Sequence, residues 1–409
     1  MINIFPMKER AIKVAIKVQQ IRIKKNKYEV HFSVDGRSKP FFKEIVYKAE
    51  YSFNEEPLDL SGVPESVLVI PFLCNILPIV WLENETLLVE CVDEDFYNCI
   101  ENIRNEYCNA FGDTLFKGGT VCANKIEKNV VDWAVDQSGL FYSGGVDSNY
   151  SLLSHRDEKL VLQLIWGNMD MNYSEKEGFD GLYQNAKSMA SRYGLPLIII
   201  RSNYRDILNR VELNAKYENI LKIRWWLGVQ HLIALAGLSA PCNYAQKIRT
   251  QYIAPSFSED LKIGHTRYPE NVDCIQYFGC RIHQDLSIAR QKKVRAIVEE
   301  SNLAESRLEL HVCFRAQNGK NCCTCEKCAI TILELMSEGA DPNDYGFMID
   351  RDIINTCIER CKRKAYDLNI TPFLDGMRAS LERNKNEVKK LPYGEIVVDS
   401  FLNLNNNDV

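Results

Sequence analysis

The stretch Leu140–Ser148, with the sequence LFYSGGVDS, most constrains how this chain can fold. An apolar run enters it, two glycines lie in its middle, and a helix-like pattern leaves it, so it predicts a strand, a tight loop and a helix. Gly144 and Gly145 permit dihedral angles that a side chain would forbid, and they let a ligand approach the backbone closely. Amides at the start of the following helix favour a bound phosphate. The loop is therefore predicted to bind phosphate.

Three side chains of the loop add to this prediction. Ser143 and Ser148 offer hydroxyl groups to phosphate oxygens, and Asp147 can hold a magnesium ion between those oxygens. The G-x-x-x-x-G-K-[ST] spacing of a Walker A loop is not found in the sequence. The alternative is a surface turn that carries two glycines and binds nothing.

The hexapeptide SGGVDS resembles the SGGxDS loop of the PP-loop ATP pyrophosphatases, which split ATP into AMP and pyrophosphate. The resemblance implies that five residues of the loop bind the phosphates of ATP: Ser143, Gly144, Gly145, Asp147 and Ser148. The loop alone does not choose among the thiolases, amidating enzymes and nitrile-forming enzymes of that superfamily.

The region around the loop predicts an α/β fold, because strand and helix patterns alternate from about Val130 onward. Strands are expected at 160–166, 195–201 and 251–256, and helices at 174–193 and 204–238. This is typical of a parallel sheet with helices on both faces, in which ligands gather at the carboxyl ends of strands. Three further segments are then expected on the same rim as the loop: Asp170, Arg201 and 256–260.

Residues 1–129 predict a β-rich accessory domain, because apolar residues alternate with polar ones over 11–34. Further predictions are a hairpin turn at Asp35–Gly36, strands at 41–53 and 67–72, a helix at 95–111 and a linker at 112–129. The domain is expected to act as a scaffold or lid, and the alternative is docking of a partner or a macromolecular substrate.

The remaining chain divides into a PP-loop-like domain at 130–335 and a helical C-terminal region at 336–409. Amphipathic helices are predicted at 349–366 and 373–388, with Cys357 and Cys361 packed in a core. The apolar run 67–82 is interrupted by two prolines and is too short to span a bilayer, so no membrane is expected.

Five cysteines lie within residues 313–328, and four of them have the spacing C-x8-C-x2-C-x2-C: Cys313, Cys322, Cys325 and Cys328. Two C-x2-C steps bring sulfurs together on a tight knuckle, which predicts a structural zinc site with no open coordination position. Cys323 is the fifth cysteine and is taken as a buried filler or free thiol. The alternatives are cysteines without a metal and a redox or iron–sulfur role.

A basic segment at 290–295 contains two further candidate residues, Arg290 and Lys293, one helical turn apart. A pyrophosphatase must neutralise the charge that builds on its leaving group, and Arg or Lys is the usual means. PP-loop proteins have a similar R-x-x-K segment. The alternative is an ordinary solvated basic helix face.

The loop and the cysteine spacing together resemble the 7-cyano-7-deazaguanine synthase (QueC-like) branch of the PP-loop proteins, over roughly 137–335. The resemblance implies adenylation of 7-carboxy-7-deazaguanine or a related acid with ATP and Mg²⁺. Ammonia or an amine then captures the adenylate, and the product is an amide, a nitrile or a protein conjugate. It also implies catalytic roles for four residues: Asp147, Ser148, Arg290 and Lys293. Zn²⁺ would be held by the four cysteines.

The expected partners are a small carboxylate and ammonia or an amine, with a protein acceptor and a homodimer left open. A cytoplasmic location is expected, because lysines and arginines interrupt any secretory pattern in residues 1–25. The net charge of −5 counts against a nucleic-acid partner. The added N-terminal domain suggests a specialised relative, and the resemblance suggests that such relatives can serve antiviral defence. Two rival hypotheses are a PP-loop tRNA-modifying or sulfur-transfer enzyme and an ATP-binding scaffold.

Overall fold

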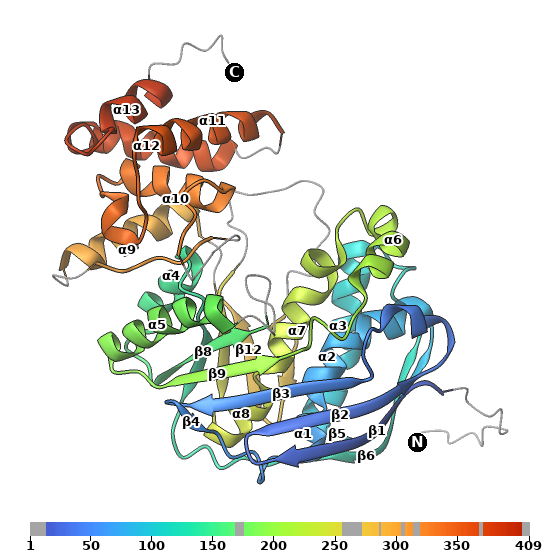
Figure 1. Ribbon diagram of the computed structural model, residues 1–409. Coiled ribbons are helices and arrows are strands. Elements are labelled where there is room, and N and C mark those ends of the chain that lie inside the picture. Colours follow the sequence, from blue (N-terminus) through green and yellow to red (C-terminus); the bar gives the residue numbers. More distant parts are fainter. Residues whose placement is uncertain are drawn as a thin grey trace, which may run out of the picture.

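The computed structural model describes residues 14–167, 176–255, 272–285, 288–303, 307–313, 320–367 and 371–402. Twelve strands within these ranges form one mixed sheet (Figure 1). They are β1 (Val14–Lys24), β2 (Lys27–Val34), β3 (Val46–Phe53), β4 (Glu56–Pro57), β5 (Thr86–Asp93), β6 (Thr120–Glu127), β7 (Ser138–Phe141), β8 (Leu160–Trp166), β9 (Leu197–Ser202), β10 (Thr250–Ile253), β11 (Gln276–Tyr277) and β12 (Cys280–Gln284).

Helices pack on the sheet and form the C-terminal region (Figure 1). The α-helices are α1 (Glu65–Leu68), α2 (Ile70–Glu83), α3 (Glu94–Phe111), α4 (Val146–His155), α5 (Lys176–Tyr193), α6 (Arg210–Leu221), α7 (His231–Leu238), α8 (Ala240–Gln246), α9 (Arg290–Leu303), α10 (Glu326–Ser337), α11 (Arg351–Asp367), α12 (Thr371–Val388) and α13 (Gly394–Leu402). Shorter turns are the 3₁₀ helices η1 (Gly36–Phe41) and η3 (Pro342–Tyr345) and the π-helical turn η2 (Trp226–Gln230).

The strands β12, β10, β7, β8 and β9 are neighbours in that order and are parallel to one another, as predicted for this part of the chain. The chain runs from β7 through β8 to β9 on one side and then returns to β10 and β12 on the other side of β7. The strand order therefore reverses at β7. In open α/β sheets such a reversal is the place where ligands bind, just beyond the carboxyl ends of the strands.

Helices cover both faces of this parallel part, because alternate residues of its strands belong to different cores. Leu140 and Leu162 pack in a core with Val146 of α4 and Val294 of α9. Phe141, Val161 and Ile165 point to the opposite core, which contains most of α2 and α7. The predicted α/β fold with a largely parallel sheet and many helices is thus confirmed. The period-two alternation of β-strands explains how one strand serves two cores.

The N-terminal strands extend the same sheet. β3 pairs antiparallel with β9, and β2, β1, β5 and β6 follow it. The hairpin turn between β1 and β2 lies at Lys25–Asn26, with Lys25 at φ +53°. The turn predicted at Asp35–Gly36 was wrong as a hairpin, because Gly36 begins the 3₁₀ helix η1 after β2. One hydrogen-bonded sheet crosses the predicted boundary between 1–129 and 130–335, and the division into domains stays a prediction.

The strand predicted at 67–72 was wrong, because the segment is helical and belongs to α1 and α2. Almost every residue of α2 is buried, and the helix packs against α7. A helix that is apolar on all sides has no helical period to recognise, so it resembles a buried strand. Pro71 sits in the first turn of α2, where a missing N–H is tolerated.

The linker predicted at 112–129 was wrong over its second half, which forms β6 in parallel pairing with β5. The helix predicted at 204–238 is divided into α6, η2 and α7, with Lys222 in the left-handed region at φ +60°. The predicted helices at 174–193, 349–366 and 373–388 correspond to α5, α11 and α12. Cys357 and Cys361 lie in the core that contains Leu140 and Val294, as expected.

The C-terminal helices stack on α10, which contacts α9, α11 and α12 (Figure 1). α9 in turn packs on α4, the helix that follows the glycine loop. Within the described ranges, every helix is too short or too polar to traverse a bilayer.

Candidate active site and metal centre

The glycine loop has the predicted strand–loop–helix geometry. β7 ends at Phe141, Gly145 is the N-cap residue, and α4 begins at Val146. Gly144 has φ +77°, and a Cβ placed there would lie 2.6 Å from Oδ1 of Asn185. A Cβ on Gly145 would meet its nearest atom, the carbonyl oxygen of His311, at 3.5 Å. Gly144 is therefore required by the fold itself, whereas a Cβ on Gly145 would make only ordinary van der Waals contacts beside the helix N-terminus.

Asn149 holds the loop in place, and sequence reasoning missed it. Its Nδ2 donates to the carbonyl oxygens of Gly144 and Gly145, at 2.9 Å each, and its Oδ1 accepts from the Tyr142 hydroxyl at 3.0 Å. The amide of His311 donates to Gly144 O at 2.8 Å. Because the carbonyl oxygens of Gly144 and Gly145 accept these hydrogen bonds, the loop is held in one conformation. The position of Asn149 directly after the motif is the sequence signal that could have identified this role.

Two cations meet Asp147 at the start of α4. Lys293 Nζ donates to Asp147 Oδ1 at 2.6 Å, and Arg290 Nη1 lies 3.7 Å from Asp147 Oδ2. The Lys293 side chain is 1% exposed, whereas that of Asp147 is 34% exposed. The structure thus brings together the loop and both predicted basic residues, although they are far apart in sequence.

Glu334 of α10 is a further charged partner, and sequence reasoning missed it. Its Oε2 accepts from Arg290 Nε at 3.0 Å, and Thr331 Oγ1 accepts from Arg290 Nη2 at 2.9 Å. Burial raises the pKa of Glu334 to about 7, against the opposing pull of Arg290. Burial also opposes the charge on Arg290, but Glu334 and Asp147 outweigh it and raise the arginine pKa. Arg290 is therefore oriented from α10 and presents its remaining edge toward Asp147.

A cavity of about 220 Å³ opens beside the loop. Residues that follow β7 and β10 line it, in agreement with the position of the strand reversal. Polar residues on its lining are Ser143, Asp147, Ser148, Gln163, His231, Arg290, His311 and Lys327. Apolar residues on its lining include Phe141, Ile165, Leu235 and Ile253. The lining thus combines charged and polar groups suited to phosphate with apolar groups suited to a flat ring.

His231 is uncharged at neutral pH. Burial, followed by the charges of Lys327 and Arg205, lowers the pKa of its imidazole to about 4. His311 also has a lowered pKa, because burial outweighs the effect of Glu309. Neutral imidazoles can both donate and accept hydrogen bonds, so neither ring adds charge to the cavity.

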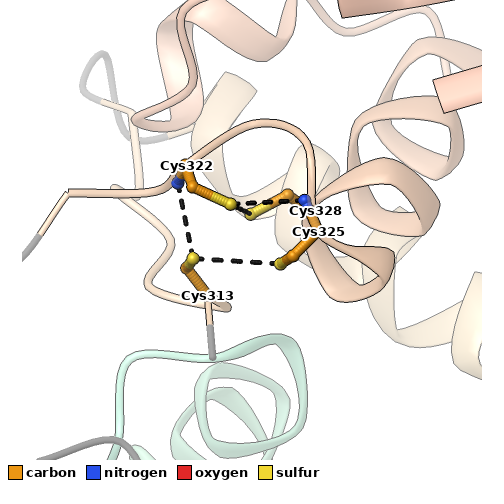
Figure 2. Close-up of side chains that lie close together, drawn as sticks. All are labelled: Cys313, Cys322, Cys325 and Cys328. Atoms are coloured by element: carbon orange, nitrogen blue, oxygen red, sulfur yellow. Dashed lines mark hydrogen bonds between the residues drawn. The ribbon is translucent and has the colours of Figure 1, made fainter. Parts of the chain in front are cut away.

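The four predicted cysteines converge on one point (Figure 2). Their sulfurs lie within 4.8 Å of one another, with Cys313 and Cys325 at 3.8 Å and Cys322 and Cys328 at 4.0 Å. A tetrahedral site with metal–sulfur distances of about 2.3 Å requires sulfurs about 3.8 Å apart. The cluster therefore fits a metal ion such as zinc and leaves no open position on it.

Metal ligation requires thiolates, so a bound cation would have to displace the protons of the thiols. A hydrogen bond with Cys325 and burial raise the pKa of Cys328, so this thiol keeps its proton until a cation takes its place. Cys323 is outside the group, because its Sγ accepts from the Met348 amide at 3.3 Å. Its φ of +58° is in the region that glycine favours.

The four-cysteine group adjoins the cavity, since Cys313 is among the residues that line it. Arg201 is elsewhere: its guanidinium lies over the Trp166 ring at 4.2 Å, in a separate hollow with Glu50 and Phe179. Asp170 and 256–260 lie outside the described residues, so their predicted place on the rim stays a prediction.

Comparisons of the chain with protein-family models, with curated proteins and with solved structures found no significant match. What the chain does is therefore inferred from its own residues.

Proposed function

We propose that the chain binds ATP and magnesium and activates a carboxylate as an acyl adenylate, with release of pyrophosphate. One observation carries the proposal: Lys293 and Arg290 both lie against Asp147. Asp147 belongs to the glycine loop, and this loop borders the cavity. The resemblance of SGGVDS to the PP-loop ATP pyrophosphatases supplies the reaction class.

The residues suggest a division of roles. The amides at the start of α4 and the hydroxyls of Ser143 and Ser148 would bind phosphate oxygens. Lys293 and Arg290 would stabilise the negative charge that builds on the departing pyrophosphate. Asp147 would orient Lys293 and offer a carboxylate oxygen to magnesium, which when bound supplies further neutralisation of phosphate charge.

Burial makes this arrangement effective. Lys293 is almost fully removed from water, so its field on a phosphate in the cavity is weakly screened. The apolar residues of the cavity lining would help to exclude water from the reactive adenylate. Because the four-cysteine group offers no open metal position, its proposed role is to fasten α10 and the His311 segment beside the loop.

The proposed acid is 7-carboxy-7-deazaguanine or a related acid, and the product is an amide, a nitrile or a protein conjugate. The test is incubation of the protein with ATP, Mg²⁺, this acid and ammonia, followed by mass spectrometry of the products. AMP together with an amide or nitrile is the expected result. Lys293→Met is the matched inactive variant, and Lys292→Met, at an exposed neighbour, is the control.

Other outcomes would each select a different function. AMP formed only with cell lysate would indicate another acid or a macromolecular acceptor. A shift of tRNA at physiological salt would favour the tRNA-modifying hypothesis. ATP binding without AMP under any of these conditions would contradict the proposed activity and favour a scaffold.

A further inference from the structure

A buried glutamine in the cavity belongs to a chain of side-chain amides. Gln163 lies on β8 between Val161 and Ile165, on the strand face that packs into the core with α2 and α7, and it is fully buried. A buried amide in such a place is unfavourable unless both of its ends are hydrogen-bonded. One end is satisfied, because Gln163 Nε2 donates to Asn243 Oδ1 at 2.8 Å.

The relay continues to the backbone, and this determines the orientation of each amide. Asn243 Nδ2 donates to Gln251 Oε1 at 3.1 Å, and Gln251 Nε2 donates to the carbonyl oxygen of Tyr252 at 3.3 Å. A carbonyl can only accept, so Gln251 must present its oxygen to Asn243. Asn243 must then present its own oxygen to Gln163. Gln163 is left with its nitrogen toward Asn243 and its oxygen turned away from the relay.

The side-chain oxygen of Gln163 has no hydrogen-bond partner within the described part of the chain. Gln163 Oε1 is buried and accepts no hydrogen bond there, and Gln163 is one of the residues that line the cavity. A buried acceptor without a donor costs free energy, and native structures rarely retain one without a reason. A ligand that brings its own N–H group would remove this cost.

The surroundings restrict the kind of ligand. Phe141, Ile165, Leu235 and Ile253 line the cavity as apolar walls, and His231 adds an uncharged imidazole. Apolar residues with hydrogen-bonding groups such as Gln163 and His231 among them suit a flat heterocycle. Gly139 makes room for the relay, because a Cβ there would lie 2.5 Å from Gln251 Oε1 and 2.7 Å from Gln163 Nε2.

We propose that Gln163 Oε1, held by Asn243 and Gln251, accepts a hydrogen bond from an amino or ring N–H group of a planar nitrogen heterocycle bound in this cavity. The inference rests on the proposed function, which supplies two possible sources of such a ring: the adenine of ATP and the base-like ring of the acid. Gln163 would then be a specificity-determining residue of the site.

The experiment compares ligands first and needs no variant for that step. Binding to the wild-type protein is measured by calorimetry for ATP and for purine riboside triphosphate, which lacks the 6-amino group. Steady-state kinetics with the deazapurine acid give its KM, and both measurements are repeated with Gln163→Met. Gln230→Met is the matched control, because Gln230 is also fully buried with an Oε1 that lacks a described partner, but it does not line the cavity.

The two sources predict different results. If Gln163 contacts adenine, the analogue binds the wild type about tenfold more weakly than ATP, and Gln163→Met removes the difference. If it contacts the acid, the two nucleotides bind alike and Gln163→Met raises the KM for the acid about tenfold. Equal nucleotide binding by the wild type, with a KM no more changed in Gln163→Met than in Gln230→Met, would overturn the inference.

Failure of the proposed function gives a separate result. Discrimination between ATP and its analogue that depends on Gln163, without AMP from any acid, would overturn the activity and support the glutamine contact. Binding of neither heterocycle by the wild type would overturn both.

Discussion

Lys293 Nζ lies 2.6 Å from Asp147 Oδ1, and the two residues are 146 positions apart in the sequence. The contact joins the first turn of α9 to the first turn of α4, and the two helices pack against each other. The lysine is buried and the aspartate is partly exposed, so the cation depends on this carboxylate while the carboxylate keeps access to the cavity. Asp147 lines the cavity and Lys293 does not, so the lysine charge lies behind the carboxylate as seen from the cavity.

Replacement of Lys293 by Met removes this cation and leaves Asp147 partly exposed to water. We expect AMP formation to fall about 100-fold or more, because the variant lacks the preorganised positive charge that would stabilise the leaving pyrophosphate. The free energy of unfolding should change little in Lys293→Met. It should fall more in Asp147→Asn, because that change leaves the buried Lys293 ammonium without its carboxylate partner. AMP release and thermal unfolding are measured on both variants, with Lys292→Met as the exposed control. Wild-type AMP release by Lys293→Met would remove the lysine from the proposed site.

The two glycines of the loop should respond differently to alanine. Gly144→Ala places a Cβ 2.6 Å from Asn185 Oδ1 at φ +77°, so we expect a loss of stability of about 1–2 kcal/mol or more. Gly145→Ala meets only an ordinary contact at 3.5 Å, so it should cost less stability than Gly144→Ala, mainly because alanine is a poorer N-cap residue than glycine. It should nevertheless weaken ATP binding, because its methyl group occupies the approach to the helix N-terminus. Calorimetric unfolding and ATP titration test the pair, and ATP affinity unchanged in Gly145→Ala would argue against phosphate at this position.

The cysteine group predicts one zinc ion per chain. Each Ser replacement of Cys313, Cys322, Cys325 or Cys328 should remove the metal, because three thiolates no longer close the tetrahedron. Cys323→Ser is the matched control and should retain it, since its Sγ lies outside the group. Metal content is measured by elemental analysis. Hydrogen exchange should show lost protection in α10, which begins at this group. Loss of zinc in Cys323→Ser alone would reassign the ligands.

The pH dependence of stability should include a contribution from His155. Its ring lies 2.7 Å from Glu158 Oε1 and 2.8 Å from Asp285 Oδ1. Burial opposes its charge, but the two carboxylates prevail and raise its pKa above the ordinary 6.5. A raised folded-state pKa contributes stability that is fully present below pH 6.5 and is lost as the pH rises through the folded-state value. We therefore expect urea unfolding to show falling stability above pH 6.5.

His155→Gln should lack this decline. The matched control is His283→Gln, because His283 is 47% exposed and its pair with Asp273 is expected to contribute little. An identical pH profile for wild type and His155→Gln would contradict the assignment. The comparison needs no ligand and no activity, so it tests the fold independently of the proposed function.

The sequence predicted local structure correctly where the residues that determine it are neighbours in the chain. The strand, loop and helix around Gly144 are as predicted, because glycine conformation and helix N-terminal geometry are properties of a few residues. The convergence of Cys313, Cys322, Cys325 and Cys328 was also predicted from their spacing, since a knuckle brings close residues together. The strand predicted at 67–72 was wrong for the opposite reason: full burial of α2 removed the periodic signal.

The sequence by itself determined the glycine loop, the cysteine knuckle and the alternation of strands and helices, because short-range backbone preferences and side-chain spacing specify each of them. Only the tertiary structure decided that β3 joins β9, that Glu334 orients Arg290, and that Asn243 and Gln251 orient Gln163. These contacts depend on packing between distant segments, which acts through shape and burial and leaves no local pattern along the chain.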